Sequence, residues 1–386
     1  MLKLNSNSIR ALSPVVRSEP GVYRLSEGSA PTPGFEDREM FIARKPGSPL
    51  SPGFVGYTFF ANPAAELPAN SFLFEKDLSY LKAGDIIKLS PKQSSLRVLY
   101  RRNSPNNFFL TTERCNNYCL MCSQPPKDRD DSYIVQDILA AIPLMSPETK
   151  SIGLTGGEPT LLGVDLIKIV ENLKTSLPST AVHILSNGRA FKAWDYSQRI
   201  AQVQHPDLMI GIPLYSDISS LHDYIVQADG AFDDTIRGII NLKSVGVQVE
   251  IRVVLHKLTY ERLPDLARFI RRNLTFCDHV ALMGLEITGF TKFNFDRLWI
   301  DPKDYQGQLV QAVLALHRAH IPVSIYNHQL CVIDQRIMSF SRKSISDWKN
   351  NYLPKCDPCM RKNDCGGFFS TSGERYSSHI RPFVTA

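Results

Sequence analysis

The sequence contains no run of 18 uncharged apolar residues, so a transmembrane helix of ordinary length is not expected. Residues 1–17 carry Lys3 and Arg10 but no continuous apolar stretch, so a cleaved signal peptide is not expected either. There is no long basic tract, and the net charge is only +6, which is compatible with an acidic partner but does not demand nucleic acid. These absences predict a cytoplasmic protein with no membrane partner, in a compartment that keeps thiols reduced.

Cysteine is scarce, with eight residues in a chain of 386, but most of it is clustered. The cysteines form two tight groups and two isolated positions, namely Cys115, Cys119 and Cys122, then Cys356, Cys359 and Cys365, with Cys277 and Cys331 apart. In a reducing compartment such grouping favours metal ligation over disulfides. Cys277 has no partner at metal-ligand spacing, and we interpret it as a free, partly buried thiol.

Residues 1–104 are rich in proline and contain short apolar runs separated by turn signals. The runs lie at 55–60, 71–74, 86–89 and 96–100. This pattern predicts a small β-rich domain with irregular loops.

From residue 105 to 326 the pattern changes to alternating strands and helices. Near-continuous apolar runs predict strands at 108–112, 152–155, 182–186, 208–213, 249–255 and 280–285. Amphipathic helices are expected around 162–173 and 232–240, and a third is expected from Asp301, as N-cap, to about His320. Six strand–helix units in series predict an α/β domain with a parallel sheet, either a partial barrel or a doubly wound sheet. Residues 327–386 lack periodicity and form a cysteine-rich extension.

The first cysteine group has the spacing C-x₃-C-x₂-C and follows the first strand of the parallel series. Its thiols are therefore expected at the carboxyl edge of the sheet, where α/β folds bind ligands. Three thiolates leave one position of a four-ligand site open. From spacing alone, an iron–sulfur cluster, a zinc site with a distant fourth ligand and inert thiols all remain open.

The next strand runs into Gly156-Gly157-Glu158-Pro159, just before an amphipathic helix. Two glycines allow a ligand to approach the backbone closely, and proline fits a helix start. Alone this is an ordinary turn, but one strand after C-x₃-C-x₂-C it is a specific signal. Together the two motifs resemble the radical S-adenosylmethionine (SAM) superfamily over residues 106–290.

The resemblance implies a partial (β/α)₆ barrel, a [4Fe–4S] cluster held by the first cysteine group, and bound SAM. It assigns the methionine amine of SAM to Gly156, Gly157 and Glu158, and its ribose and carboxylate to Ser186, Asn187 and Ser216. The family usually has an aromatic residue near adenine just before the third cysteine, where this chain has Met121. Methionine can pack on a ring, and Tyr118 offers an aromatic face instead.

Residues 112–126 resemble more narrowly the radical SAM maturases of the His-Xaa-Ser system, specifically the C member of the pair. Residues 222–232 resemble a segment common in members that modify peptides. The resemblance implies a ribosomally made peptide substrate with His-Xaa-Ser repeats and a second maturase as a partner. An electron donor such as flavodoxin or ferredoxin would also be required.

The second cysteine group reads C-x₂-C-x₅-C, with Cys331 lying 25 residues upstream of Cys356. Four thiolates would close a metal site. The spacing partly resembles the auxiliary-cluster region of peptide-modifying radical SAM enzymes, although Phe369 stands where a further cysteine is expected. A second [4Fe–4S] cluster, a structural zinc ion and unligated thiols all remain open.

Two classes of function follow. The first is an enzyme that cleaves SAM reductively and uses the resulting radical, acting on a peptide or alternatively on RNA or a small molecule. The second is a non-catalytic iron–sulfur adaptor. The Gly-Gly-Glu turn favours the enzyme, because a purely structural site needs no open coordination position.

Overall fold

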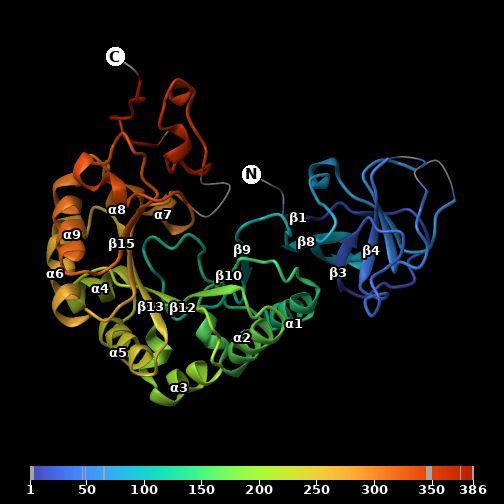
Figure 1. The fold of residues 1–386 in the computed structure, drawn as a ribbon, viewed down its shortest axis with the longest axis horizontal. Coiled ribbons are helices and arrows are strands. Elements are labelled where there is room, and N and C mark those ends of the chain that lie inside the picture. Colours follow the sequence, from blue (N-terminus) through green and yellow to red (C-terminus); the bar gives the residue numbers. More distant parts are fainter. Residues whose placement is uncertain are drawn as a thin grey trace.

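Two β-sheets organise the chain in the computed structural model, which describes residues 4–45, 47, 49–63, 66–344, 350–373 and 375–384. One sheet belongs to the N-terminal residues and the other to the region from residue 107 to 326. The two lie side by side, and the C-terminal residues lie beyond the second sheet (Figure 1).

The N-terminal sheet has eight strands in the order β1-β8-β7-β3-β4-β5-β6-β2. They are β1 (Asn5–Ser6), β2 (Arg10–Ala11), β3 (Gly21–Ser26), β4 (Glu39–Ala43), β5 (Gly56–Phe59), β6 (Ser71–Leu73), β7 (Ile86–Ser90) and β8 (Ser95–Tyr100). The last four confirm the predicted apolar runs. The first four strands are not among the predicted runs: β1 and β2 are only two residues long, Arg24 interrupts β3, and β4 begins with Glu39. In the structure Arg24 of β3 donates a 2.7 Å hydrogen bond to Glu39 of β4.

The second sheet contains seven strands, and every neighbouring pair is parallel. They are β9 (Asn107–Leu110), β10 (Ser151–Thr155), β11 (Ala181–Leu185), β12 (Leu208–Pro213), β13 (Gln248–Leu255), β14 (His279–Gly284) and β15 (Val323–Tyr326). The first six confirm the predicted strands to within two residues, and β15 adds a seventh.

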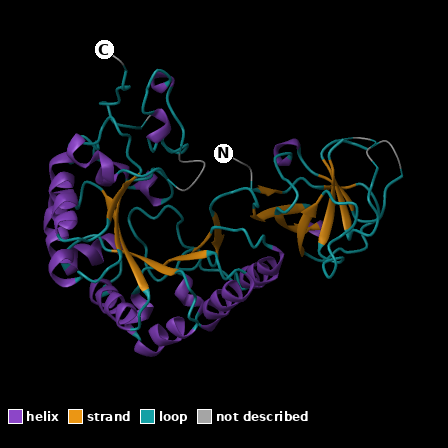
Figure 2. Ribbon diagram, viewed as in Figure 1, coloured by secondary structure: helices purple, strands orange, loops and turns teal. Residues whose placement is uncertain are grey.

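The strands follow one another across the sheet in chain order, from β9 to β15. The helices are α1 (Tyr133–Ala141), α2 (Val164–Ser176), α3 (Trp194–Gln202), α4 (Ser219–Val226), α5 (Ala231–Ser244), α6 (Leu263–Asn273), α7 (Phe290–Phe293), α8 (Phe295–Leu298) and α9 (Gln306–Arg318). Figure 2 shows α1–α3, α5, α6 and α9 along the outer side of the curved sheet. A doubly wound sheet would carry helices on both faces and reverse its strand order, so the domain is a partial barrel.

One expected helix start is wrong. The helix predicted to begin at Asp301 begins at Gln306 instead. Asp301 caps a preceding turn by accepting a 2.9 Å hydrogen bond from the backbone N–H of Lys303, and its other carboxylate oxygen accepts from Ser378 at 3.1 Å. The carboxylate thus ties the C-terminal extension to the barrel.

The main hydrophobic core lies between the second sheet and its outer helices. Ile86, Leu99 and Tyr100 of the N-terminal sheet belong to the same core, and Lys88 pairs with Asp137 of α1 at 2.6 Å. The N-terminal sheet is therefore anchored to the barrel through α1.

The C-terminal extension has little regular structure, as its sequence predicts. Its described residues form short 3₁₀ turns, among them Gln335–Phe340, Pro354–Cys356 and Lys362–Asp364. Val332, Phe368 and Ile380 form a small core of their own. In the described residues, no helix combines the length and the apolar character that a membrane crossing requires.

Candidate functional site

Three cysteine thiols lie on one open cavity of about 1250 Å³ at the carboxyl edge of the barrel sheet. We call it the site cavity. Its wall includes most of the predicted site residues, namely Cys115, Cys119, Cys122, Gly156, Gly157, Glu158, Ser186 and Asn187. These residues come from the ends of β9, β10 and β11, because successive parallel strands deliver their carboxyl ends to the same edge.

Ser216 does not line this cavity, unlike the other predicted residues. It is fully buried, and its hydroxyl oxygen accepts a 3.1 Å hydrogen bond from the backbone N–H of Ile218. This contact stabilises the turn that leads into α4. The contact between Ser216 and SAM therefore stays a prediction, and the position of Ser216 outside the cavity wall does not support it.

The cysteine loop is held in place by helix α4. The backbone N–H groups of Tyr118 and Leu120 donate to the carbonyls of Val226 and Ile225, at 3.0 and 2.9 Å. Both carbonyls belong to the last turn of α4, where such groups lack helical partners. The loop thereby supplies the C-terminal cap of a helix more than 100 residues later in the chain.

Arg189 holds the same loop from the opposite side. Its guanidinium donates to the carbonyl of Asn116 at 3.1 Å and to the side chain of Asn117 at 2.8 Å, and it also pairs with Asp234. The Asn187 amide donates to the Asn116 side chain at 2.6 Å. These bonds fix the loop between the first two cysteines.

Burial governs the acidity of the three thiols. Burial raises the pKa of Cys115 to about 11 and also raises the pKa values of Cys119 and Cys122, with the neighbouring thiols adding to the shift at Cys115 and Cys119. The free thiols therefore stay protonated at neutral pH. A bound cationic centre would reverse this, because metal ligation deprotonates thiols.

The Gly-Gly turn packs directly against the cysteine loop. The backbone N–H of Gly157 donates to the Thr112 carbonyl, and that of Glu158 donates to the Arg114 carbonyl, both at 2.7 Å. A Cβ atom on Gly157 would lie 2.0 Å from the Arg114 carbonyl oxygen. Glycine is required here because two backbones meet, whereas the sequence pattern predicts close approach of a ligand.

Glu158 is buried and engaged by the neighbouring strand end. Its carboxylate accepts from the Thr160 N–H at 3.0 Å, the Thr160 hydroxyl at 2.6 Å, the Ser186 hydroxyl at 2.7 Å and the Asn187 N–H at 2.6 Å. Burial raises the pKa of Glu158, although these hydrogen bonds oppose the shift. The carboxylate thus joins the Gly-Gly turn to the end of β11.

Residues 109–270 match the model of the Radical SAM superfamily. This segment is a radical SAM domain. No curated protein matches the chain. Among solved structures, SuiB of Streptococcus suis bound to S-adenosylmethionine is 16% identical, with a TM-score of 0.48, over 66% of this chain and 56% of SuiB. Native anSMEcpe with bound AdoMet is 16% identical, with a TM-score of 0.45, over 56% of this chain and 62% of anSMEcpe. The alignments with SuiB structures span only about half of that protein's length.

Tyr215, and not Tyr118, lies at the site cavity of the radical SAM domain. Tyr118 is 52% exposed and does not line the site cavity. Met121 and Tyr215 do line it, and they pack in one apolar cluster. Tyr215 is held by ring stacking on His222, whose Nδ1 accepts from the Tyr215 N–H at 3.2 Å. Its place two residues after β12 is the signal that could have identified it.

A polar network begins at Arg252 in the wall of the site cavity and connects β13, β14 and β15. Arg252, which lines the cavity, pairs with Glu250 on the same strand. Glu250 also pairs with His279 at 2.8 Å, and His279 reaches the Ser324 hydroxyl at 3.0 Å. Burial would raise the pKa of Glu250, but the His279 hydrogen bond and the charge of Arg252 outweigh it and lower that pKa to about 2.

This network predicts an acid-dependent loss of stability. A carboxyl whose folded pKa lies below its unfolded value stabilises the fold above the unfolded pKa, and this contribution is lost as pH falls toward the folded pKa. The free energy of unfolding of the wild type should therefore exceed that of Glu250→Gln by about 3 kcal/mol at pH 7, with about half of the difference gone at pH 3 and nearly all of it by about pH 2. Urea unfolding of both apoproteins between pH 7 and pH 2 measures this difference in stability. A difference that does not change with pH would contradict the assignment.

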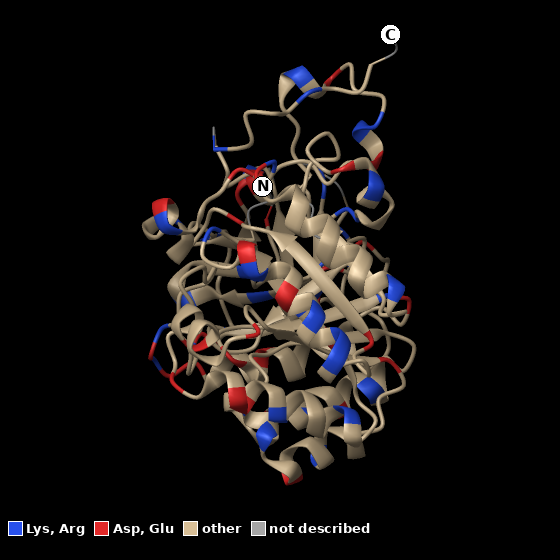
Figure 3. Ribbon diagram, turned by 90° about the vertical axis from the view of Figure 1, so that its left-hand side faces the viewer, with Lys and Arg blue, Asp and Glu red and all other residues tan. Residues whose placement is uncertain are grey.

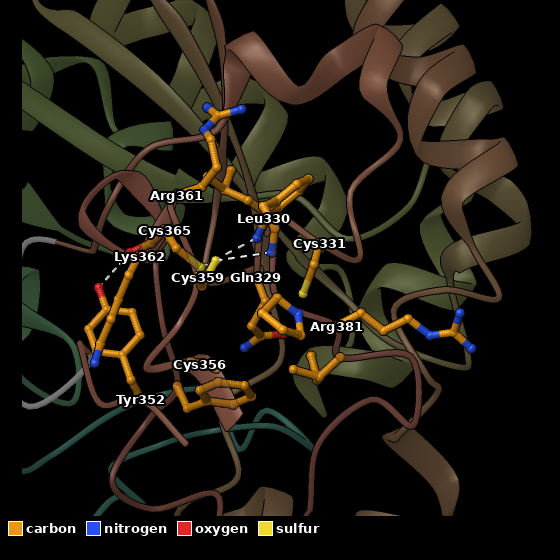
Figure 4. A pocket seen from close by; sticks show the side chains of 14 residues that line it. Gln329, Leu330, Cys331, Tyr352, Cys356, Cys359, Arg361, Lys362, Cys365 and Arg381 are labelled. Atoms are coloured by element: carbon orange, nitrogen blue, oxygen red, sulfur yellow. Dashed lines mark hydrogen bonds between the residues drawn. The ribbon is translucent and has the colours of Figure 1, made fainter. Parts of the chain in front are cut away.

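The second cysteine group also surrounds one cavity. Cys331, Cys356, Cys359 and Cys365 line one small cavity in the C-terminal extension (Figure 4). Backbone N–H groups of Leu330 and Gly367 point at the Cys365 sulfur, both at 3.5 Å, and that of Phe383 points at the Cys359 sulfur at 3.4 Å. Such N–H···S contacts are typical around cluster thiolates, whose reduction potential they tune. The structure thus brings Cys331 together with the three later cysteines.

The arrangement of each cysteine group can be compared with the ligands that an iron–sulfur cluster or a zinc ion requires. Within the described ranges, no three His, Cys, Asp or Glu side chains are arranged to hold a single metal ion. In both groups the sulfurs instead line a cavity, and thiolates are ligands that suit both iron–sulfur clusters and zinc, so the donor atoms of each group fit either centre. The first group leaves the remainder of the large site cavity for SAM.

Proposed function

We propose that this protein is a radical SAM enzyme that cleaves SAM reductively and modifies a ribosomally made peptide. One observation carries the proposal: three thiols, the Gly-Gly turn and the ends of β11 and β12 share one cavity at the carboxyl edge of a radical SAM domain. Three ligands on an open cavity suit chemistry, whereas a structural site would be closed.

Each part of the cavity would have a separate task. Cys115, Cys119 and Cys122 would hold a [4Fe–4S] cluster through three irons. The bound cluster and SAM would supply one-electron reduction of SAM and a 5′-deoxyadenosyl radical. The chain's own residues would orient the cofactor, since Arg252 offers guanidinium donors and Met121 with Tyr215 an apolar wall. No side chain needs to act as a general base in this first step.

The test of SAM chemistry is direct. Protein reconstituted with iron and sulfide without oxygen should absorb broadly near ~400 nm, from thiolate-to-iron charge transfer, and bleach with dithionite. The reduced protein should release 5′-deoxyadenosine from SAM, slowly when no substrate is present. Reconstituted, reduced protein that binds a cluster but releases none would contradict the enzyme and favour the adaptor.

The prediction of a peptide substrate rests on residues 112–126, which resemble His-Xaa-Ser maturases, and on residues 222–232, which resemble a segment of peptide-modifying members. In the structure Asp223 of the second segment accepts from the N–H groups of Gly230 and Phe232, both at 2.7 Å, and so shapes the turn between α4 and α5. The expected substrate is a short peptide with His-Xaa-Ser repeats, with a second maturase and a flavodoxin or ferredoxin as partners. A mass change of such a peptide, dependent on SAM and reductant, is the measurement. Modification of RNA instead would contradict it.

We also infer that the second cysteine group holds an auxiliary cluster. The four sulfurs around one cavity and the N–H groups aimed at two of them support this reading. In the described extension, regular secondary structure is sparse, so metal ligation would contribute much of its order.

Cys359→Ala is therefore expected to loosen the extension without unfolding the barrel. Limited proteolysis should cut residues 327–386 at least about tenfold faster, because the closed ligand set supplies part of their folding free energy. Metal analysis should show loss of one of the two centres.

The matched control is Cys277→Ala. Cys277 is buried in the barrel core and belongs to neither group. Its substitution should leave metal content and protection of the extension unchanged. If Cys359→Ala keeps its protection, the four thiols do not form a metal centre. If the wild-type extension contains zinc, the auxiliary-cluster reading is wrong.

A further inference from the structure

Two further cavities adjoin the site cavity in a row. A narrow intermediate cavity shares Gly284, Leu285 and Asn327 with it. An outer cavity of about 990 Å³, open to solvent, shares Ile287, Ser372 and Arg375 with the intermediate one. The three cavities therefore adjoin one another in a row, which we call the path, from the cysteine loop to the outer cavity.

The intermediate cavity has a largely aromatic wall. The side chains that form this wall are Trp299, Tyr305, Phe368, Phe369 and Tyr376. They come from both the barrel and the C-terminal extension, so the path is completed only where the extension lies on the barrel. Flat, rigid side chains can contact a peptide over a large area with little loss of conformational entropy.

The outer cavity carries positive charge. Its lining includes Lys292 of α7 and Arg375, and within the described chain neither forms an ion pair with a carboxylate. Arg375 is held in place because its guanidinium lies 4.5 Å from the ring centre of Phe295, which in turn stacks on Trp299 at 5.6 Å. No Asp or Glu is found among the described residues that line the intermediate or outer cavity.

Hydroxyl groups complete the outer cavity. Ser372 and Thr371 both line it, and the buried Thr371 hydroxyl oxygen has no hydrogen-bond partner among the described residues. A buried hydroxyl without a partner costs free energy unless a ligand satisfies it. Two cationic side chains and a free hydroxyl together match an anion that accepts several hydrogen bonds.

We propose that the outer cavity binds a carboxylate of the peptide substrate, while the adjoining peptide crosses the aromatic wall toward the site cavity. The inference rests on the proposed peptide-modifying function and adds a substrate class: peptides with an anionic group a few residues from the modified one. The carboxylate belongs to an Asp or Glu side chain or to the peptide's C-terminus. The enclosed aromatic wall and the single cationic pair favour a peptide over a nucleic acid, whose backbone needs a run of phosphate contacts.

The test uses peptides on a biosensor surface with the full-length, reconstituted protein in solution. The probes are nonapeptide mixtures with neutral residues around a central Asp or a central Asn, both amidated at the C-terminus, and the Asn mixture with a free C-terminus. The wild type should bind one of the carboxylate probes about five- to tenfold more tightly than the amidated Asn probe. Which carboxylate probe is preferred identifies the source of the carboxylate.

The variant Lys292→Ala/Arg375→Ala should lose this preference. The control is Arg271→Ala/Arg272→Ala, which removes the same charge from exposed positions of α6 and should keep both the preference and SAM cleavage. Unchanged circular dichroism of both variants would show that they fold. Equal or absent binding of all peptide probes, or equal losses in the two variants, would overturn the proposal.

Two further outcomes separate the hypotheses. Wild-type protein that prefers carboxylate probes but does not cleave SAM would contradict the proposed function and leave this site standing. Wild-type protein that cleaves SAM without the preference would contradict this inference alone. Tighter binding of a uridine oligomer, lost in Lys292→Ala/Arg375→Ala, would assign the site to nucleic acid and overturn the peptide proposal.

Discussion

Replacing Cys115, Cys119 and Cys122 together by Ala should abolish the release of 5′-deoxyadenosine from SAM, a loss of at least about a thousandfold. The three thiols line the site cavity and are the ligands through which a cluster would be attached. Without these ligands the chain could not hold the cluster that would supply the electron for SAM cleavage. The measurement is chromatography of the nucleoside products after incubation with dithionite and SAM.

Iron analysis of the same triple variant distinguishes the two centres. Iron should fall by about half if the second cysteine group binds a cluster of equal size, because that group is formed by separate segments. Cys277→Ala is the control and should retain both iron and activity. Unchanged iron in the triple variant would mean that the first group binds no cluster, and unchanged nucleoside release would contradict the assignment of the site.

The barrel strands could be predicted because burial on both faces leaves a nearly continuous apolar run in the sequence. β15 contains only Val323–Tyr326, at the edge of the sheet, and gives a weaker signal. The choice between a partial barrel and a doubly wound sheet depends on strand order. Strand order is a long-range property that local periodicity does not contain.

The candidate site could be predicted in large part, because motifs at the carboxyl ends of neighbouring parallel strands must meet. Cys115, Gly157 and Asn187 share the site cavity for this reason. The contacts that hold the cysteine loop could not be predicted. Tyr118 is tied to Val226, 108 residues later, and neither residue carries a sequence signal for the pairing.

The distribution of charged residues in Figure 3 is relevant to nucleic acid as a possible partner. Along the ribbon in that view, Lys and Arg positions are interspersed with Asp and Glu positions. A nucleic-acid-binding face usually concentrates its positive charge along one path. The distribution agrees with the even spread of charge along the sequence.

Gly157→Ala should disable the site even though it adds one methyl group and removes no ligand. The added Cβ would lie 2.0 Å from the carbonyl oxygen of Arg114 and 2.5 Å from its carbonyl carbon. The partner is backbone and cannot rotate away, so the cysteine loop must shift by about 1 Å to reach ordinary contact distance. Overpacking of this kind costs about 1–3 kcal/mol.

The shift would act on chemistry more strongly than on stability. The loop leads directly into Cys115, and Arg114 also accepts the Glu158 N–H at 2.7 Å, so the thiols and the Gly-Gly turn would move apart. A misplacement of about 1 Å at a reacting centre can reduce the rate about a hundredfold. We therefore expect SAM cleavage in Gly157→Ala to fall about a hundredfold, with SAM binding weakened as well.

Gly307→Ala provides the matched control. Gly307 lies in α9, where an added Cβ would meet nothing within 4 Å. Alanine is the better helix former, so this variant should be unchanged or up to about 1 kcal/mol more stable. Thermal unfolding, cluster absorbance and nucleoside release should be measured on both variants. If Gly157→Ala keeps full activity and normal cluster content, the loop can yield without cost, and the close approach of the two backbones does not position the site.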